Sequence, residues 1–296
     1  MFVKKCCLGV DFSTNMDATI IGWGYTSEDA GVLSDILQEA SVTTMTDSDC
    51  RNTNYNPDFI YDEHICAGAA GVDACAGDAG GPLMVEQSGQ WWLAGIISWG
   101  TGCAREGYPG VYTETSHFTD WIYKITSENQ VPTTTVTTTT TTTTTQVPFP
   151  YDCGMRTNET CRTRIINGTE TEGCAWPWQA ALLEKKGLSF ELFCGGTIYN
   201  DEWIITTATC VKDKSKEVIE VEVGEWILSD SDGYEQLAAV AEIIVHPDYN
   251  ETNNAHDIAL LRLSSFLNLD YKHVAPVCMA EIYKNYTSYE GVVTGT

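Results

Sequence analysis

The 296-residue sequence predicts an all-β protein made of two small barrels, one on each side of a threonine-rich segment. Three observations support this fold class. Short apolar runs recur along both parts of the chain, Gly, Asn and Asp residues separate these runs, and only one stretch spaces its apolar residues as a helix does. Many short strands separated by turns are typical of barrels and sandwiches.

The domain boundary is the segment 131–148, in which threonine fills positions 133–145 except for Val136. A Thr/Pro tract cannot bury apolar surface, so we expect an extended, O-glycosylated linker. At about 3.1 Å per residue it would reach roughly 55 Å. The predicted domains are therefore residues 1–130, the linker 131–150 and residues 151–296.

Strands are predicted wherever an apolar run lies between turn residues. Before the linker these runs are 36–44, 64–67, 82–86, 91–98 and 110–113. A short helix closes this part, because Phe118, Trp121, Ile122 and Ile125 recur at helical spacing. After the linker the predicted strands are 180–183, 190–199, 203–206, 218–223, 237–245 and 257–263.

The formal charge of −25 is shared almost equally, with −13 on residues 1–131 and −12 on residues 132–296. Such a field repels nucleic acid and anionic lipid and favours cationic partners. A solvated acidic surface without a partner is the other interpretation, and it stays open.

Twelve cysteines, six on each side of the linker, favour disulfides in an oxidising compartment. Zinc is the alternative, but the chain has no Cys-x-x-Cys pair and its five histidines are scattered, so we predict neither metal nor cofactor. Four Asn-x-Thr sites, at Asn158, Asn167, Asn250 and Asn285, add to an extracellular assignment.

Residues 1–10 lack the apolar core of a signal peptide, and no apolar run approaches the roughly 18–20 residues of a membrane span. We therefore expect no membrane anchor in this sequence. We also expect that the chain is a piece of a longer exported protein.

The segment Asp73-Ala-Cys-Ala-Gly-Asp-Ala-Gly-Gly-Pro82 resembles the Gly-Asp-Ser-Gly-Gly-Pro signature of trypsin-like serine proteases, with Ala79 in the place of the nucleophilic serine. The surrounding motifs follow the order found in the C-terminal barrel of that family. They are Gly22-Trp-Gly24, Ile65-Cys-Ala-Gly68, Ser98-Trp-Gly100 and Pro109-Gly-Val-Tyr112.

The part after the linker resembles the N-terminal barrel of the same family. Its motifs are Arg164-Ile-Ile-Asn-Gly168, similar to the activation cleavage site, Trp176-Pro-Trp-Gln179, Cys194-Gly-Gly196, Trp203-Ile-Ile-Thr-Thr-Ala-Thr-Cys210 and His256-Asp-Ile-Ala-Leu-Leu261. The resemblance therefore implies trypsin-like barrel halves in the order C-terminal barrel, linker, N-terminal barrel. The simplest explanation of this order is that the chain is a fragment of a longer protein with tandem protease domains. A genuinely permuted domain is the alternative.

The resemblance places Asp257 at the catalytic aspartate, Thr209 at the histidine and Ala79 at the serine. This mechanism needs a hydroxyl nucleophile, an imidazole base and a carboxylate that orients the base. Only the carboxylate is kept, so we expect no catalysis.

Binding features implied by the resemblance are retained. Asp73 matches the acidic residue of the pocket for Arg or Lys, although a solvated turn aspartate is the other interpretation. Ser98, Gly100 and Gly110 match the pocket walls, and the N–H groups of Gly77 and Ala79 match the oxyanion hole. Asp78 matches the partner of the α-amino group that cleavage between Arg164 and Ile165 would release. Ile165 belongs to the other half of the chain, so this pairing leads to the hypothesis that the two barrels close on each other.

The resemblance also implies the disulfides Cys50–Cys66, Cys75–Cys103, Cys194–Cys210 and Cys153–Cys278, and leaves Cys6, Cys7, Cys161 and Cys174 unassigned. Three functions stay open. The first is a secreted, inactive homologue that binds basic peptides or a partner protease. The second is a fragment of a multidomain endopeptidase that cleaves after Arg or Lys, and the third is a structural extracellular glycoprotein.

Overall fold

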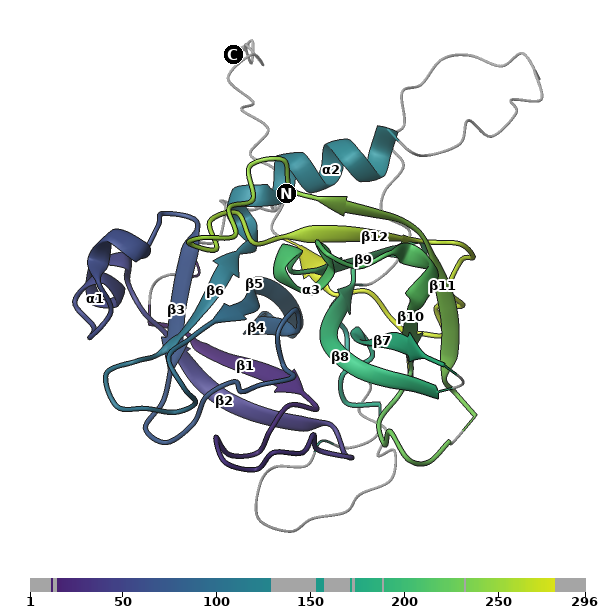
Figure 1. The fold of residues 1–296 in the computed structure, drawn as a ribbon, viewed down its shortest axis with the longest axis horizontal. Helices are drawn as coiled ribbons and strands as arrows, with labels where there is room; N and C mark the ends of the chain where they lie inside the picture. The colour runs from purple at the N-terminus through teal and green to yellow at the C-terminus, as the bar shows by residue number, and fades with distance from the viewer. Residues whose placement is uncertain are drawn as a thin grey trace, which may run out of the picture.

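The computed structural model describes residues 12, 15–128, 153–156, 171, 174–187, 189–231 and 233–279. It contains two closed antiparallel barrels that lie side by side (Figure 1). We call residues 12–128 the first half and residues 171–279 the second half. The predicted all-β, trypsin-like double-barrel fold is confirmed.

The first half forms one barrel with a helix after its last strand. Its elements are β1 (Asp17–Gly22), β2 (Gln38–Thr44), α1 (Asp47–Arg51), η1 (Pro57–Phe59), β3 (His64–Gly68), β4 (Pro82–Gln87), β5 (Gln90–Trp99), β6 (Gly110–Glu114), η2 (Thr115–Phe118) and α2 (Thr119–Glu128). The strand order is β5-β4-β1-β2-β3-β6, and pairing of β5 with β6 closes the barrel.

The second half forms the other barrel. Its elements are β7 (Gln179–Lys186), β8 (Ser189–Ile198), β9 (Trp203–Thr206), α3 (Ala208–Val211), η3 (Lys216–Val218), β10 (Ile219–Val223), β11 (Gln236–Val245), β12 (Ala259–Leu263) and β13 (Cys278–Met279). The closed order is β10-β11-β12-β9-β8-β7. Strand β10, Ile219-Glu-Val-Glu-Val223, shows the alternation typical of a barrel strand. Its apolar residues are buried inside the barrel, and the glutamates between them face outward.

Two strands have no counterpart among the predicted ones. Strand β1 begins with Asp17, Ala18 and Thr19, two polar residues around a small apolar one, so its apolar run is too short to stand out. Strand β13 has only two residues and belongs to the sheet of the first half, where Cys278 and Met279 pair in parallel with Trp92 and Leu93 of β5. A sequence pattern holds no information about such a distant partner.

The two halves share one core. Trp178, fully buried, donates its indole N–H to Met84 Sδ at 2.7 Å, across the junction of the barrels. Trp23 Nε1 of the first half donates to Trp226 O at 3.3 Å. Helix α2 of the first half packs on the second half, where the ring of Trp121 lies 4.9 Å from that of His246. We call the contact surface between the two halves the seam.

A short strap also crosses the seam. Residues 153–156 are tied to the second half by the Cys153–Cys278 disulfide and by the hydrogen bond from Gly154 N to Pro276 O. Gly154 O accepts from Trp91 N of β5 in the first half at 2.8 Å. Arg156 lies over the ring of Trp176, with its Cζ 4.2 Å from the ring centroid.

The other disulfides described lie within one half each. They are Cys50–Cys66 and Cys75–Cys103 in the first half and Cys194–Cys210 in the second. Together with Cys153–Cys278 they make four described pairs, and all four are those that the family resemblance implies. Cys174 is also disulfide-bonded, while Cys6, Cys7 and Cys161 lie outside the described residues. Within those residues, the structure has no helix of the length and apolarity that a bilayer crossing requires.

Because the seam is part of the shared core, we expect Trp178→Ala to lower the free energy of unfolding by about 3–5 kcal/mol, the usual cost of removing a large buried aromatic ring. Urea denaturation should show one transition that shifts as a whole, whether it is followed by circular dichroism or by Trp fluorescence. The control Phe266→Ala removes an aromatic ring that is 72% exposed, and we expect a change of no more than about 0.5 kcal/mol. Two separate transitions, with only one of them shifted, would contradict a shared core.

Candidate active site

Two strands of the second half bring Asp257 and Thr209 together. Strands β9 and β12 are antiparallel, with Thr206 opposite Ala259. Asp257 precedes β12 by two residues, and Thr209 lies three residues after the end of β9, on the single turn α3. The Cys194–Cys210 disulfide fixes this turn to β8. The two residues therefore meet because of strand register, although 48 positions separate them in the chain.

The carboxyl group of Asp257 is buried and accepts hydrogen bonds from both halves. Thr209 N donates to Oδ1 at 2.7 Å, and Ser98 Oγ of the first half donates to Oδ2 at 2.6 Å. Burial raises the pKa of Asp257, while the hydrogen bonds from Ser98 and Thr209 oppose this shift. The backbone carbonyl of Asp257 accepts from Thr113 Oγ1, again from the first half, at 2.8 Å.

Ala79 lies on the loop before β4, at the seam. Its carbonyl oxygen accepts from Gly195 N of β8 at 2.8 Å, which places it beside the Cys194–Cys210 bridge. The next residue must be glycine: Gly80 has φ +83°, and a Cβ atom there would overlap Thr206 Oγ1 and Gly195 O. The structure thus gathers the three positions that the resemblance equates with a catalytic triad, with a methyl group and a hydroxyl group at two of them.

Tyr249 is a neighbour of this site that sequence reasoning did not identify. Its hydroxyl lies 3.0 Å from Thr209 Oγ1, and burial raises the pKa of the phenol. The loop between β11 and β12 carries Tyr249 back over α3. No sequence pattern indicates this contact, because an isolated Tyr in a polar loop is common.

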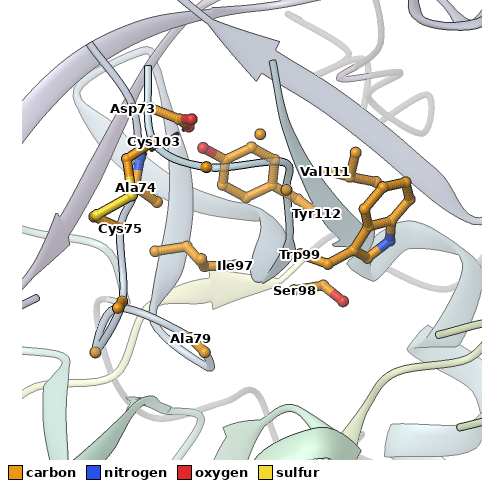
Figure 2. A pocket seen from close by; sticks show the side chains of 15 residues that line it. Asp73, Ala74, Cys75, Ala79, Ile97, Ser98, Trp99, Cys103, Val111 and Tyr112 are labelled. Carbon is orange, nitrogen blue, oxygen red and sulfur yellow. Dashed lines mark hydrogen bonds between the residues drawn. A yellow bond between two sulfur atoms is a disulfide. The ribbon is translucent and has the colours of Figure 1, made fainter. Parts of the chain in front are cut away.

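A cavity of about 210 Å³ opens next to Ala79, entirely within the first half. Figure 2 shows Asp73 at one end of the cavity and Ala79 at the other, with Ser98 and Trp99 along one side. The carboxylate of Asp73 accepts from Ala74 N at 2.9 Å and from Ala104 N at 3.0 Å. Burial raises the pKa of Asp73, which those two hydrogen bonds counteract.

The floor of the cavity requires a glycine. A Cβ atom on Gly110 would lie 2.8 Å from Asp73 Oδ1 and 2.9 Å from the Tyr112 hydroxyl, so a side chain there would fill the space in front of the carboxylate. Gly100 lines another side, and its nearest side-chain neighbour, the Tyr55 hydroxyl, would be 3.7 Å from an added Cβ. Among the described residues, the buried Tyr112 hydroxyl has no hydrogen-bond partner. The cavity therefore offers a carboxylate and a phenol to a donor-bearing ligand.

The backbone at the Ala79 end of the cavity carries two hydrogen-bond donors. The N–H of Asp78, between them, donates to Cys75 O at 3.0 Å. Within the part of the chain that the structure describes, the N–H groups of Gly77 and Ala79 have no acceptor. Gly77 has φ +100°, a backbone conformation that favours glycine. Both residues line the cavity, so a carbonyl oxygen placed there could accept from both.

Asp78 lies partly buried behind the cavity. Its Oδ1 accepts from Gly24 N at 2.7 Å and its Oδ2 from Cys75 N at 2.9 Å. Burial raises the pKa of Asp78 to about 6, although both hydrogen bonds act in the opposite direction. Arg164 and Ile165, the residues of the activation cleavage that the resemblance implies, lie outside the described residues. No group of metal-binding side chains occurs in the described residues.

The sequence profile of the trypsin family matches residues 1–122 and 165–295, which is most of the chain. The chain is 32% identical to transmembrane protease serine 9 of Rattus norvegicus over 314 aligned residues, covering 94% of this chain and 29% of that protein. It is 52% identical to trypsin-1 of Astacus astacus over 105 residues, covering 35% of this chain and 44% of the trypsin. It is 40% identical to human testisin over 136 residues, or 43% of each chain. The chain thus spans less than half the length of each of these relatives.

The raised pKa of the partly buried Asp78 predicts a specific dependence of stability on pH. Its pKa of about 6 in the folded chain exceeds the value of about 3.9 for an unfolded chain, so folding retains a proton that the unfolded chain loses. Its contribution should become less favourable by about 2 kcal/mol as the pH rises from about 4 to 7.

We therefore expect the unfolding free energy of Asp78→Asn, relative to the parent, to improve by about that amount between pH 4 and pH 7. Both proteins carry Arg164→Gln, so that no new terminus forms. The measurement is urea denaturation, and exposed Asp17→Asn is the charge-matched control. A difference between Asp78→Asn and its parent that is the same at every pH would show that this carboxyl group does not titrate as described.

Proposed function

Because the chain belongs to the trypsin family of serine proteases, we propose that it is an extracellular binding module that holds a basic side chain in the Asp73 cavity and does not cleave the bound chain. One observation carries this proposal. The cavity, its carboxylate and its two backbone donors are all present, while the positions that would do the chemistry hold Ala79 and Thr209.

The loss of chemistry follows from the atoms at these positions. The methyl group of Ala79 cannot attack a carbonyl carbon, and the hydroxyl of Thr209 cannot accept a proton near neutral pH. In subtilisin, removing either the nucleophile or the base lowers turnover by about 10⁶. The carboxylate of Asp257 remains, but its role in such a triad is to orient an imidazole, and position 209 has none.

The binding role follows from the charge in the cavity. Asp73 has no cationic side chain beside it among the described residues, and its two hydrogen bonds come from backbone N–H groups. An ammonium or guanidinium group entering the cavity would meet this carboxylate and gain a charge-assisted hydrogen bond. The net charge of −25 would favour the approach of a cationic partner. The partner proposed is a basic peptide, or a protease that presents Arg or Lys.

The proposed extracellular location is supported by the disulfides and by the names of the relatives, two of which are a transmembrane protease and a trypsin. A second candidate function follows from the fact that the chain covers only 29% of transmembrane protease serine 9. It could be one part of a larger endopeptidase whose other domains cleave after Arg or Lys. In that case the binding site described here would position substrate for a neighbouring domain.

Binding is tested with p-aminobenzamidine, a fluorescent amidine with the charge of an Arg side chain. We expect saturable binding to the purified chain, and at least about 30-fold weaker binding to Asp73→Asn, since removing one partner of a buried charge pair costs 2 kcal/mol or more. Exposed Asp17→Asn removes the same charge elsewhere and should bind as the parent does. Absence of saturable binding at millimolar probe would favour a structural glycoprotein instead.

Chemistry is tested with a fluorophosphonate probe, which labels activated serines covalently. We expect no labelling of the parent chain, of Ala79→Ser or of Thr209→His. The double variant Ala79→Ser/Thr209→His, cut after Arg164 and freed of the activating protease, should be labelled, because Asp257, itself held by Ser98, would orient the new imidazole. Labelling of the parent chain would refute the proposal that it lacks catalytic activity.

A further inference from the structure

A bidentate ion pair ties together two loops of the first half beside the cavity. Arg105 Nε donates to Glu28 Oε2 at 3.0 Å, and Arg105 Nη2 donates to Glu28 Oε1. Cys103 N adds a third hydrogen bond to Glu28 Oε2 at 3.3 Å. Glu28 belongs to the loop between β1 and β2, and Arg105 to the loop between β5 and β6. Neither Glu28 nor Arg105 belongs to the site described above.

The second of these loops carries one wall of the cavity. Cys103 lines the cavity and is disulfide-bonded to Cys75, two residues after Asp73. Ala104, between Cys103 and Arg105, donates its N–H to Asp73 Oδ2 at 3.0 Å. Glu28 therefore holds the residues on both sides of the one that positions the Asp73 carboxylate.

The loop that carries Glu28 also touches the opposite wall. Tyr25 N donates to Ala76 O at 2.9 Å, and Gly24 N donates to Asp78 Oδ1 at 2.7 Å. The side chain of Leu33 packs where a Cβ atom of Gly77 would lie. One loop thus contacts the segment 73–79 directly and the segment 103–105 through Glu28.

We propose that Glu28 is a positioning residue that keeps the Asp73 cavity formed in the uncut single chain, so that binding needs no cleavage between Arg164 and Ile165. This inference rests on the proposed binding function. In the family, the α-amino group released by cleavage is expected to order this region by pairing with the aspartate at position 78. Here the Asp78 carboxylate already accepts two backbone N–H groups, and Glu28 fixes the remaining loop.

The size of the effect follows from the setting of the ion pair. The side chains of Arg105 and Glu28 are 53% and 38% exposed, and an exposed pair contributes little unless its geometry is good or it belongs to a network. The contact is bidentate and includes the Cys103 N–H, so we expect a loss of about fivefold in affinity on removing it, at the upper end for exposed pairs. The loss should shrink as salt screens the pair.

The experiment compares p-aminobenzamidine binding to three forms: the uncut chain carrying Arg164→Gln, the parent chain cut after Arg164, and the uncut chain carrying Arg164→Gln with Glu28→Gln. We expect the first two to bind with dissociation constants within about threefold of each other, and the third to bind about fivefold more weakly. Glu191→Gln is the matched control, because it removes an ion pair with Lys186 on the β7–β8 hairpin of the other barrel and should leave binding unchanged. Urea midpoints show that every variant is folded.

Arg105→Gln separates positioning from simple charge. If Glu28 acts only by neutralising Arg105, removing the arginine should tighten binding of the cationic probe, whereas a positioning role predicts weaker binding, as for Glu28→Gln. The double variant should then be no weaker than either single variant. Binding only after cleavage, unchanged binding of Glu28→Gln, or tighter binding of Arg105→Gln would each overturn the inference. Absence of binding to the cut and uncut forms alike would instead overturn the proposed function.

Discussion

The carboxyl group of Asp257 accepts hydrogen bonds from both halves, and these bonds constrain how the two halves fit together. A buried carboxylate is costly unless its oxygens accept hydrogen bonds. Thr209 of the second half supplies one donor and Ser98 of the first half supplies the other. Either half alone would leave part of this group without a partner. The contact between the two halves therefore depends on the hydrogen bonds to Asp257 as well as on the apolar packing around Trp178.

The site divides along the same seam. Every residue that lines the Asp73 cavity belongs to the first half, including the backbone of Gly77 and Ala79. The positions that would carry out acyl transfer are split, with Ala79 in one half and Thr209 and Asp257 in the other. The proposed recognition of a basic side chain therefore depends on one barrel, whereas chemistry of this type would require two. Loss of catalysis with retention of binding, as proposed for this chain, would therefore need no change of fold.

The sequence predicted what depends on local pattern. The strand runs could be anticipated because apolar periodicity is a local property. The Asp73–Pro82 motif and the four described disulfide pairs between assigned cysteines could be anticipated only through the family resemblance, since cysteine spacing alone does not give connectivity. The rest depends on contacts between distant segments. Strand β13 has two residues and takes its partner from the other half, and Ser98 reaches Asp257 across 159 positions. Tyr249 and the Glu28–Arg105 pair lie on polar loops, where the identity of a residue says nothing about its neighbour.

The Cys153–Cys278 bond has a topological consequence. It joins positions 125 residues apart, so the backbone between them, which contains the whole second barrel from β7 to β12, forms a covalent ring. A single break of the peptide backbone anywhere in this ring opens it but releases no fragment, and the bond after Arg164 is one of those inside it. Separation into two polypeptides would require both cleavage of a peptide bond in the ring and reduction of the Cys153–Cys278 disulfide.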